Sequence, residues 1–397
     1  MRSKQFVGIL FFLFFIFIAD YCSANVNFVK SNNSDSIPLN SINLSMYQPP
    51  LNKLCFPRKK IKTHMLVDAH FHAKPFGGKA IPFAEELQYL KKSGVMFVTM
   101  MGIGQILPRT SKCTYYLDCP NISVEPSIVN DIRNAENYLV SNHSNVYVVL
   151  SMSFMDLAHP DLHDFAMLKN MNTLNHAYPG LFRWAGEVNV AKQALVKNGH
   201  KLISLKGSLK DGHVPSSFID VAVVKKWAPF MKELYKRNIP ITLHLDIGNN
   251  KQPEKYLSIM QYILKLYPNN KIIWAHMGIS KELTNLSVKR HIAMMERFLK
   301  QDKNFYLDIS WRVLQDIQFK KDMKAYTQFL DRYSTRIITG TDFVGSRNKN
   351  YLNYKQDLDV TSKILKGLNN QAYRNIVLGE NYIKLLHLPL NAPKVCQ

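Results

Sequence analysis

The sequence predicts an α/β fold, a single (β/α)8 barrel preceded by an extended N-terminal arm. From about residue 63 onward, short apolar runs without a helical period alternate with helical patterns, which is typical of βαβ units and a parallel sheet. Eight such runs lie between residues 65 and 343, the number that one barrel requires. The expected strands are 65–72, 95–102, 146–153, 182–190, 239–246, 271–278, 305–310 and 336–343.

One placement in this barrel has an alternative. The run 201–208, which contains Lys206, also has the pattern of a strand. Either it or 182–190, which contains Glu187, is the fourth strand, and the other lies in an insertion. The choice matters because the fourth strand supplies either a glutamate or a lysine to the carboxyl end of the barrel, where such enzymes place their catalytic groups.

The first strand ends in His70-Phe-His72. Side chains alternate across a strand, so both imidazoles point to one side, and two neutral imidazoles in one pocket need a shared partner such as a divalent metal. Three further apolar runs end in residues that bind metals, namely His244, His276 and Asp342. The same chemistry at four strand ends predicts a metal site at the carboxyl end of the barrel.

These residues, in this order, resemble the amidohydrolase superfamily of metal-dependent barrel enzymes. The segments Ile273-Trp-Ala-His-Met-Gly278, Tyr306-Leu-Asp-Ile-Ser310 and Val377-Leu-Gly-Glu-Asn-Tyr-Ile-Lys-Leu-Leu386 are similar to the sixth strand, seventh strand and final helix of its amidohydrolase-related branch. The resemblance extends over roughly 63–388. The Gly340-Thr-Asp-Phe segment departs from the Gly-Ser-Asp pattern of that branch, so the following loop is expected to be built differently.

The resemblance implies a role for each candidate residue. His70 and His72 would bind the first metal with Asp342, which would also take a proton from the attacking water, and His244 would be a further ligand. His276 would contact the water or the developing oxyanion in a one-metal enzyme, and would be a ligand in a two-metal enzyme.

The resemblance also favours Glu187 over Lys206 on the fourth strand, because Gly-Glu at that position is similar to binuclear relatives. Either Glu187 or a carboxylated Lys206 could bridge two ions, while Glu187 paired with Arg183 or Lys192 would be merely structural. One or two divalent ions are therefore expected. Zn suits the imidazole and carboxylate donors best, with Mn and Fe as alternatives.

The N-terminus predicts export. Residues 1–24 have a basic start, a Phe-rich apolar core and small residues before a cut near Ala24, as in a signal peptide, and 25–62 read as an arm or linker. Removal of Cys22 leaves an even number of cysteines, as expected in an oxidising periplasmic or extracellular compartment. We expect the pairs Cys113–Cys119 and Cys55–Cys396, the latter because closure of the barrel brings its two ends together. The barrel would span 63–390, followed by a tail, 391–397.

The formal charge of +22 indicates weak association with anionic envelope surfaces, but the lysines are scattered and predict no specific nucleic-acid partner. The sequence leaves the oligomeric state open. The predicted function is hydrolysis of an amide, lactone or ester bond in a small-molecule substrate. Decarboxylation of an aromatic acid on the same metal site, and an inactive barrel that serves as an envelope binding protein, are the alternatives.

Overall fold

A computed structural model describes residues 55–59, 65–75, 78–106, 125–141, 146–153, 167–192 and 221–397. The expected signal peptide, most of the arm, the Cys113–Cys119 loop and Lys206 lie outside these ranges. Within them, no helix is both long enough and apolar enough to span a bilayer.

A parallel sheet of nine strands forms the centre of the described chain, with the order β10-β9-β8-β7-β6-β5-β2-β1-β11. Its strands agree with the predicted ones in position, and β6 lies between β5 and β7, so the Glu187 segment is the fourth strand of the order. The strands are β1 (Val67–His72), β2 (Phe97–Met101), β5 (Tyr147–Met152), β6 (Phe182–Ala191), β7 (Ile241–Leu245), β8 (Ile272–Trp274), β9 (Phe305–Asp308), β10 (Ile337–Ile338) and β11 (Phe343–Val344).

The two edge strands of this sheet are halves of one chain segment, 337–344. β10 pairs with β9, and β11 pairs with β1. Between them, the carbonyl of Thr339 accepts a hydrogen bond from the amide of Ala69 (3.0 Å), and the amide of Asp342 donates to the carbonyl of His70 (2.7 Å). The two ends of the sheet therefore meet, which is consistent with the predicted (β/α)8 barrel.

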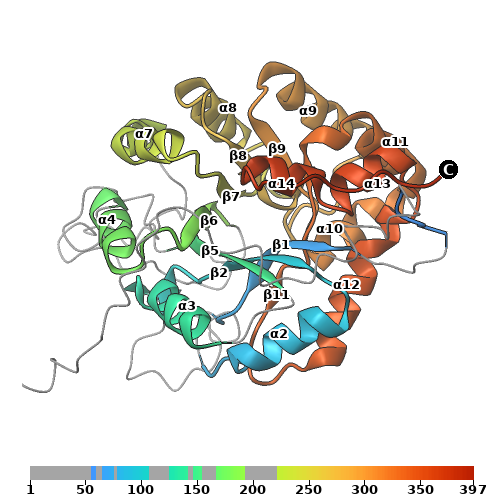
Figure 1. Cartoon of the computed structure of the whole chain (residues 1–397). Helices are drawn as coiled ribbons and strands as arrows, with labels where there is room; N and C mark the ends of the chain where they lie inside the picture. The colour runs from blue at the N-terminus through green and yellow to red at the C-terminus, as the bar shows by residue number, and fades with distance from the viewer. Residues whose placement is uncertain are drawn as a thin grey trace, which may run out of the picture. The chain divides into compact units, whose positions relative to one another are not determined.

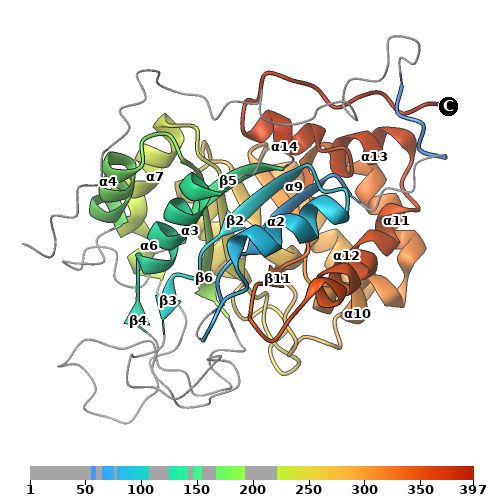
Figure 2. The ribbon, with the colours of Figure 1, turned by 60° about the horizontal axis from the view of Figure 1, so that its bottom comes forward.

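Helices cover the outer side of this sheet, and α2 and α3 lie below β2 and β5 in Figure 1 and in front of them in Figure 2. The helices are α2 (Phe83–Lys92), α3 (Val129–Val140), α4 (Met167–Ala177), α6 (Val221–Val224), α7 (Ala228–Lys236), α8 (Leu257–Leu266), α9 (Val288–Gln301), α10 (Arg312–Ile317), α11 (Met323–Arg332), α12 (Tyr351–Leu365), α13 (Asn370–Ile376) and α14 (Glu380–Leu385). Short 3-10 turns are η5 (Lys225–Trp227), η6 (Ala275–Gly278), η7 (Phe319–Lys321) and η8 (Ser334–Arg336), and β3 (Gln105–Ile106) pairs antiparallel with β4 (Glu125–Pro126).

The sequence of α9 explains how such a helix forms and packs. Ser287 caps its first turn by accepting a hydrogen bond from the amide of Arg290, which satisfies one of the free donors at a helix start. One face of the helix is buried, and its Phe298 ring packs edge to face against the fully buried Trp274 of β8 at 5.3 Å. Burial of this apolar face, more than helix propensity, holds α9 on the sheet.

Two predicted strands differ from the structure at their ends. The run 271–278 stays extended only to Trp274, and the following turn η6 holds His276 and Met277 in the left-handed region, with φ of 55° and 50°. The run 336–343 is interrupted before Phe343, where Asp342 has φ of 56°. In both places the residue that the sequence analysis assigned to the metal site has a left-handed backbone conformation.

The two ends of the described chain are tied together. Cys55 and Cys396 form a disulfide, as predicted. Beside it, the amide of Phe56 donates to the carbonyl of Lys394 (2.6 Å), and the amide of Cys396 donates to the carbonyl of Phe56 (3.0 Å). The end of the arm and the C-terminal tail thus pair with each other, while the Cys113–Cys119 disulfide stays a prediction.

Candidate metal centre

The carboxyl ends of the strands bring the predicted site residues into one buried cluster. His70 and His72 come from β1, Glu187 from β6 and His244 from β7. The other two stand on the interrupted segments, His276 in η6 and Asp342 before β11. Their donor atoms form two groups that could hold an ion and that share Glu187, and a third such group joins His70 and His276 to Asp308.

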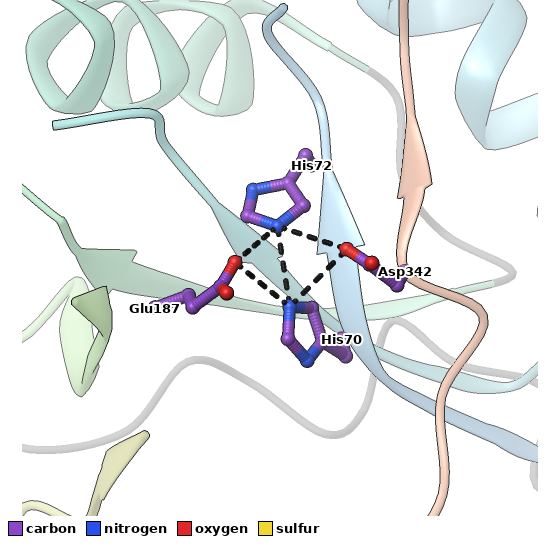
Figure 3. Close-up of side chains that lie close together, drawn as sticks. All are labelled: His70, His72, Glu187 and Asp342. Carbon is purple, nitrogen blue, oxygen red and sulfur yellow. Dashed lines mark hydrogen bonds and ion pairs between the residues drawn. The ribbon is translucent and has the colours of Figure 1, made fainter. Parts of the chain in front are cut away.

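The first group consists of His70, His72, Glu187 and Asp342, whose side chains converge in Figure 3. The two Nε2 atoms of the histidines lie 3.2 Å apart. Oε2 of Glu187 lies 3.3 Å from Nε2 of His70 and 3.0 Å from that of His72. Oδ1 of Asp342 lies 3.4 and 3.3 Å from the same two nitrogens.

The hydrogen bonds made by the two Nδ1 atoms determine whether each Nε2 carries a proton or a free lone pair. Nδ1 of His70 donates to Oδ2 of Asp308 (2.7 Å), and Nδ1 of His72 donates to the carbonyl of Gly102 (3.2 Å). In the neutral tautomer this leaves a lone pair on each Nε2, directed at the cluster. Two lone pairs and two carboxylate oxygens then face one point, which is the donor set of a divalent cation.

In the metal-free protein, protons take the place of the cation. Burial lowers the pKa of His70, but the carboxylates of Asp308, Asp342 and Glu187 outweigh it and raise this pKa well above its ordinary value. For His72, burial likewise lowers the pKa, and hydrogen bonds to Asp342 and Glu187 raise it overall. Because metal ligands must be deprotonated, an ion that enters this cluster displaces these protons.

The second group lies on the other carboxylate oxygen of Glu187. Oε1 is hydrogen-bonded to Nδ1 of His244, and it lies 3.8 Å from Nε2 of His276 and 3.6 Å from Nζ of Lys192. Burial raises the pKa of Glu187, but Lys192 and His244 hold it well below its usual range, so the group is ionised. The structural pairing with Lys192 is thus present, whereas Arg183 donates to Tyr147 and to a backbone carbonyl.

His276 presents an unpartnered nitrogen to the site. Its Nδ1 lies 3.3 Å from the carbonyl of Ser310, which can only accept, so this nitrogen carries the proton. Its Nε2 is buried and has no hydrogen-bond partner among the described residues. Burial lowers the pKa of His276, which keeps the imidazole neutral and its Nε2 an acceptor.

Left-handed backbone is concentrated at this site. Among the described residues other than glycine, six have positive φ, and four of them are His276, Met277, Trp311 and Asp342. Such conformations cost of order 1–3 kcal/mol each for bulky residues, so they persist only where the surroundings hold them. Asp342 is held from two sides, because its amide bonds to β1 and the preceding Thr341 is bound by the buried carboxylate of Asp68 at 2.8 and 2.9 Å.

Two glycines allow the backbone to lie very close to a neighbouring strand at this site. A Cβ at Gly340 would lie 2.6 Å from the backbone nitrogen of His70, so only glycine lets this segment come against β1. Gly186, with φ of 96°, similarly lies against the backbone of Thr242 on β7, where a Cβ would meet the carbonyl oxygen at 2.2 Å. Both glycines precede a site carboxylate by one or two residues, so they allow the carboxylates to reach the cluster.

Three site residues escaped the sequence analysis: Asp308, Ser310 and Trp311. Ser310 Oγ donates to Asp308 (2.6 Å) and lies 3.1 Å from Nδ1 of His70 and 3.0 Å from Nδ1 of His276. The half-buried Trp311 places its ring 4.8 Å from that of His276. The Tyr306–Ser310 motif carried the signal, since these residues end the seventh strand, but it suggested a family and not a role.

Comparison with known proteins shows that part of this chain matches the model of one protein family. A family model described as amidohydrolase matches residues 191–387, about half of the chain. The match contains His244, His276, Asp308 and Asp342 but begins after Glu187, so the structure alone joins His70 and His72 to these residues. It is a hydrolase family, and the match does not favour the decarboxylase alternative. No curated protein sequence matches this chain.

Several solved structures are similar in outline. A putative 2-pyrone-4,6-dicarboxylic acid hydrolase from Pseudomonas putida is 11% identical, with a TM-score of 0.47 over 82% of this chain and 99% of the other. A zinc-bound amidohydrolase from Burkholderia multivorans is 12% identical, with a TM-score of 0.47 over 82% and 100%. Dihydroorotase from Saccharomyces cerevisiae is 12% identical, with a TM-score of 0.44 over 82% and 84%. With TM-scores below 0.5, these likenesses support no inference about substrate.

Proposed function

Because the chain belongs to the amidohydrolase superfamily of metal-dependent hydrolases, we propose that it hydrolyses an amide, lactone or ester bond of a small molecule at the cluster around His70. The observation that carries this proposal is a pair of imidazole nitrogens 3.2 Å apart, each of which lies 3.0–3.4 Å from the same two carboxylate oxygens. Four acceptors at these distances, three of them on buried residues, are stable only around protons or a cation.

A divalent ion at this cluster would polarise the scissile bond and lower the pKa of water to about 7, which makes hydroxide available at neutral pH. His70, His72, Glu187 and Asp342 are the residues that would hold it. We propose Zn as this ion, with Mn and Fe as alternatives, because imidazole and carboxylate donors suit these metals.

Asp342 is the residue best placed to move the proton. Its side chain is 13% exposed, against 1% for His70 and 4% for Glu187, so it is the member of the cluster that a substrate can reach. Burial raises its pKa, but His70, His72 and His276 lower it far below the ordinary value, which keeps it ionised. The attacking water gives its proton to Asp342, its oxygen bonds to the carbonyl carbon, and the C–N or C–O bond breaks as Asp342 passes the proton to the leaving group.

Metal content tests this proposal. The purified chain should retain at least one equivalent of divalent metal by elemental analysis, and His70→Ala should lose it, because His70 is held in the ligating tautomer. His176→Ala, which changes an exposed histidine in the last turn of α4, is the matched control and should keep the metal. A wild-type chain without metal after supplementation would refute the proposed centre.

We also propose that the protein acts after export, with its first residue near position 25. The Cys55–Cys396 disulfide supports this, since disulfides persist mainly in oxidising compartments. N-terminal sequencing of the protein recovered from the medium or periplasm tests it. A chain that retains residues 1–24 and stays in the cytoplasm would contradict the proposal.

A further inference from the structure

The carboxylate of Glu187 faces cations on both sides. Its Oε2 faces His70 and His72, where the first ion is proposed. Its Oε1 faces His244, His276 and the ammonium of Lys192, which lies 3.6 Å away. The group that occupies the Oε1 side therefore decides whether the protein uses one ion or two.

Lys192 is held beside Oε1 of Glu187 by its position at the end of β6. It directly follows the last residue of β6, and its side chain is only 12% exposed, so its charge is largely withdrawn from water. The pairing of β6 with β7 shifts register between Asn189 and Ala191, and this irregularity breaks the strict alternation of side chains. Lys192, five positions after Glu187, can for this reason return to the same carboxylate.

We propose that the ammonium of Lys192 takes the place of a second metal ion, so that the protein works with a single ion held by His70, His72, Glu187 and Asp342. This inference rests on the proposed metal centre. An ion ligated by Oε1 at about 2.0–2.2 Å would stand within a few ångströms of a fixed positive charge in a poorly solvated site. One carboxylate oxygen would then face two repelling cations.

The surroundings of His244 agree with a single ion. Its Nδ1 is hydrogen-bonded to Glu187, and its Nε2 lies 3.0 Å from Oδ1 of Asp246. Both ring nitrogens thus face carboxylates, which only accept hydrogen bonds, so each nitrogen is placed to donate one. His244 and Lys192 together neutralise the Oε1 side of Glu187 without metal.

A single ion also gives His276 a role. With no second ion to bind, its Nε2 stays an acceptor, 3.8 Å from both Oε1 of Glu187 and Oδ2 of Asp342. A water held between these atoms would donate one proton to His276 and offer the other to Asp342. His276 is then a catalytic residue that orients the water, and not a ligand.

Metal stoichiometry tests the inference without relying on activity. Wild type, Lys192→Met, Lys192→Gln and Lys192→Arg are loaded with graded Zn, freed of excess by gel filtration and analysed for bound metal, with melting curves as a check on folding. Lys349→Met is the matched control, because Lys349 is another partly buried lysine with a charge interaction to Asp342. We expect one equivalent in wild type, Lys192→Arg and Lys349→Met, and two in Lys192→Met and Lys192→Gln, with second-site affinity raised at least tenfold.

Each contrary result has a distinct meaning. Two equivalents in wild type at stoichiometric Zn would overturn the inference and leave the proposed function standing. One equivalent in both Lys192→Met and Lys192→Gln at saturating Zn would do the same. No metal in any variant would instead refute the proposed centre itself. If Lys192→Met fails to fold, Lys192→Gln, which keeps a polar group of similar length, decides the question.

Discussion

Asp308 should control metal affinity although it lies outside the predicted ligand set. Its Oδ2 accepts the proton of His70 Nδ1 at 2.7 Å, and its Oδ1 accepts from the amide of Ser310 at 2.7 Å. Burial raises the pKa of Asp308, yet His70 and His276 lower it overall, so the carboxylate is ionised and can only accept. This bond fixes the tautomer that directs the Nε2 lone pair of His70 into the cluster.

The substitution Asp308→Asn keeps the shape of the side chain and removes the charge. If the amide oxygen faces His70, the hydrogen bond becomes neutral and loses about half its strength. If the amide nitrogen faces it, the proton moves to Nε2 and the lone pair is lost. A hydrogen bond to a charged group contributes about 1.5–3 kcal/mol. The loss of affinity should therefore lie between about fourfold, when half of the smaller value is lost, and about 150-fold, when all of the larger value is lost.

The assay is competition for Zn with a chromophoric chelator at pH 7, for wild type and Asp308→Asn. Asp302→Asn is the matched control, since Asp302 is a buried carboxylate that accepts from the amide of Asn304 just before β9, at the opposite end of the same strand. We expect the control to bind Zn as wild type does. An Asp308→Asn affinity within threefold of wild type would refute the tautomer argument.

Three further predictions concern catalysis, the disulfide and acid stability. Asp342→Asn should lower kcat of the metal-loaded protein by about 10²–10⁴-fold, because the amide cannot take a proton; retained kcat on the best substrate would exclude it as the base. Serine at both Cys55 and Cys396 should lower the free energy of unfolding by about 2–6 kcal/mol, since the disulfide closes a separation of 341 residues; a loss below about 1 kcal/mol in denaturant titration would contradict this. Burial lowers the pKa of His291 from 6.5 to about 4, so between these values the unfolded chain binds more protons than the folded chain at this residue. His291 alone should therefore lower the free energy of unfolding of the metal-free protein by about 2 kcal/mol from pH 7 to pH 4.5. His291→Gln should weaken that dependence, and an equally steep loss in this variant would count against the assignment.

The strands and most of the site could be predicted because they depend on local patterns. An apolar run of strand length reports burial on both faces, and a histidine or aspartate at its end reports the carboxyl edge of the sheet. This was enough to place His70, His72 and His244 at strand ends. Glu187, which lies within β6, was instead favoured by the family resemblance. The disulfide between Cys55 and Cys396 followed from the closure that such a barrel requires.

The rest depends on contacts that no local pattern records. The turn that carries His276 is stabilised by a hydrogen bond from His291 on α9 to the carbonyl of Met277 (2.9 Å), and nothing in the run 271–278 indicates it. Asp308 differs from other buried aspartates only by its distance to His70. The pairing of Lys192 with Glu187 was one of the alternatives that the sequence offered, but the register shift in β6 that brings the two side chains together is not visible in the sequence.

The segment 337–344 joins the last strand to the first, and Asp342 lies within it. The proposed ligands His70 and Asp342 are thus neighbours in space whose contact forms only when the sheet is complete, which places it among the late, non-local steps of folding. A cation bound by both His70 and Asp342 would link the first strand of the sheet to the last. In the metal-free state, local opening of the protein should begin where these two short strands meet. With the ion bound, the same opening would require release of the ion, so loss of metal would reduce both the activity and the stability of the barrel.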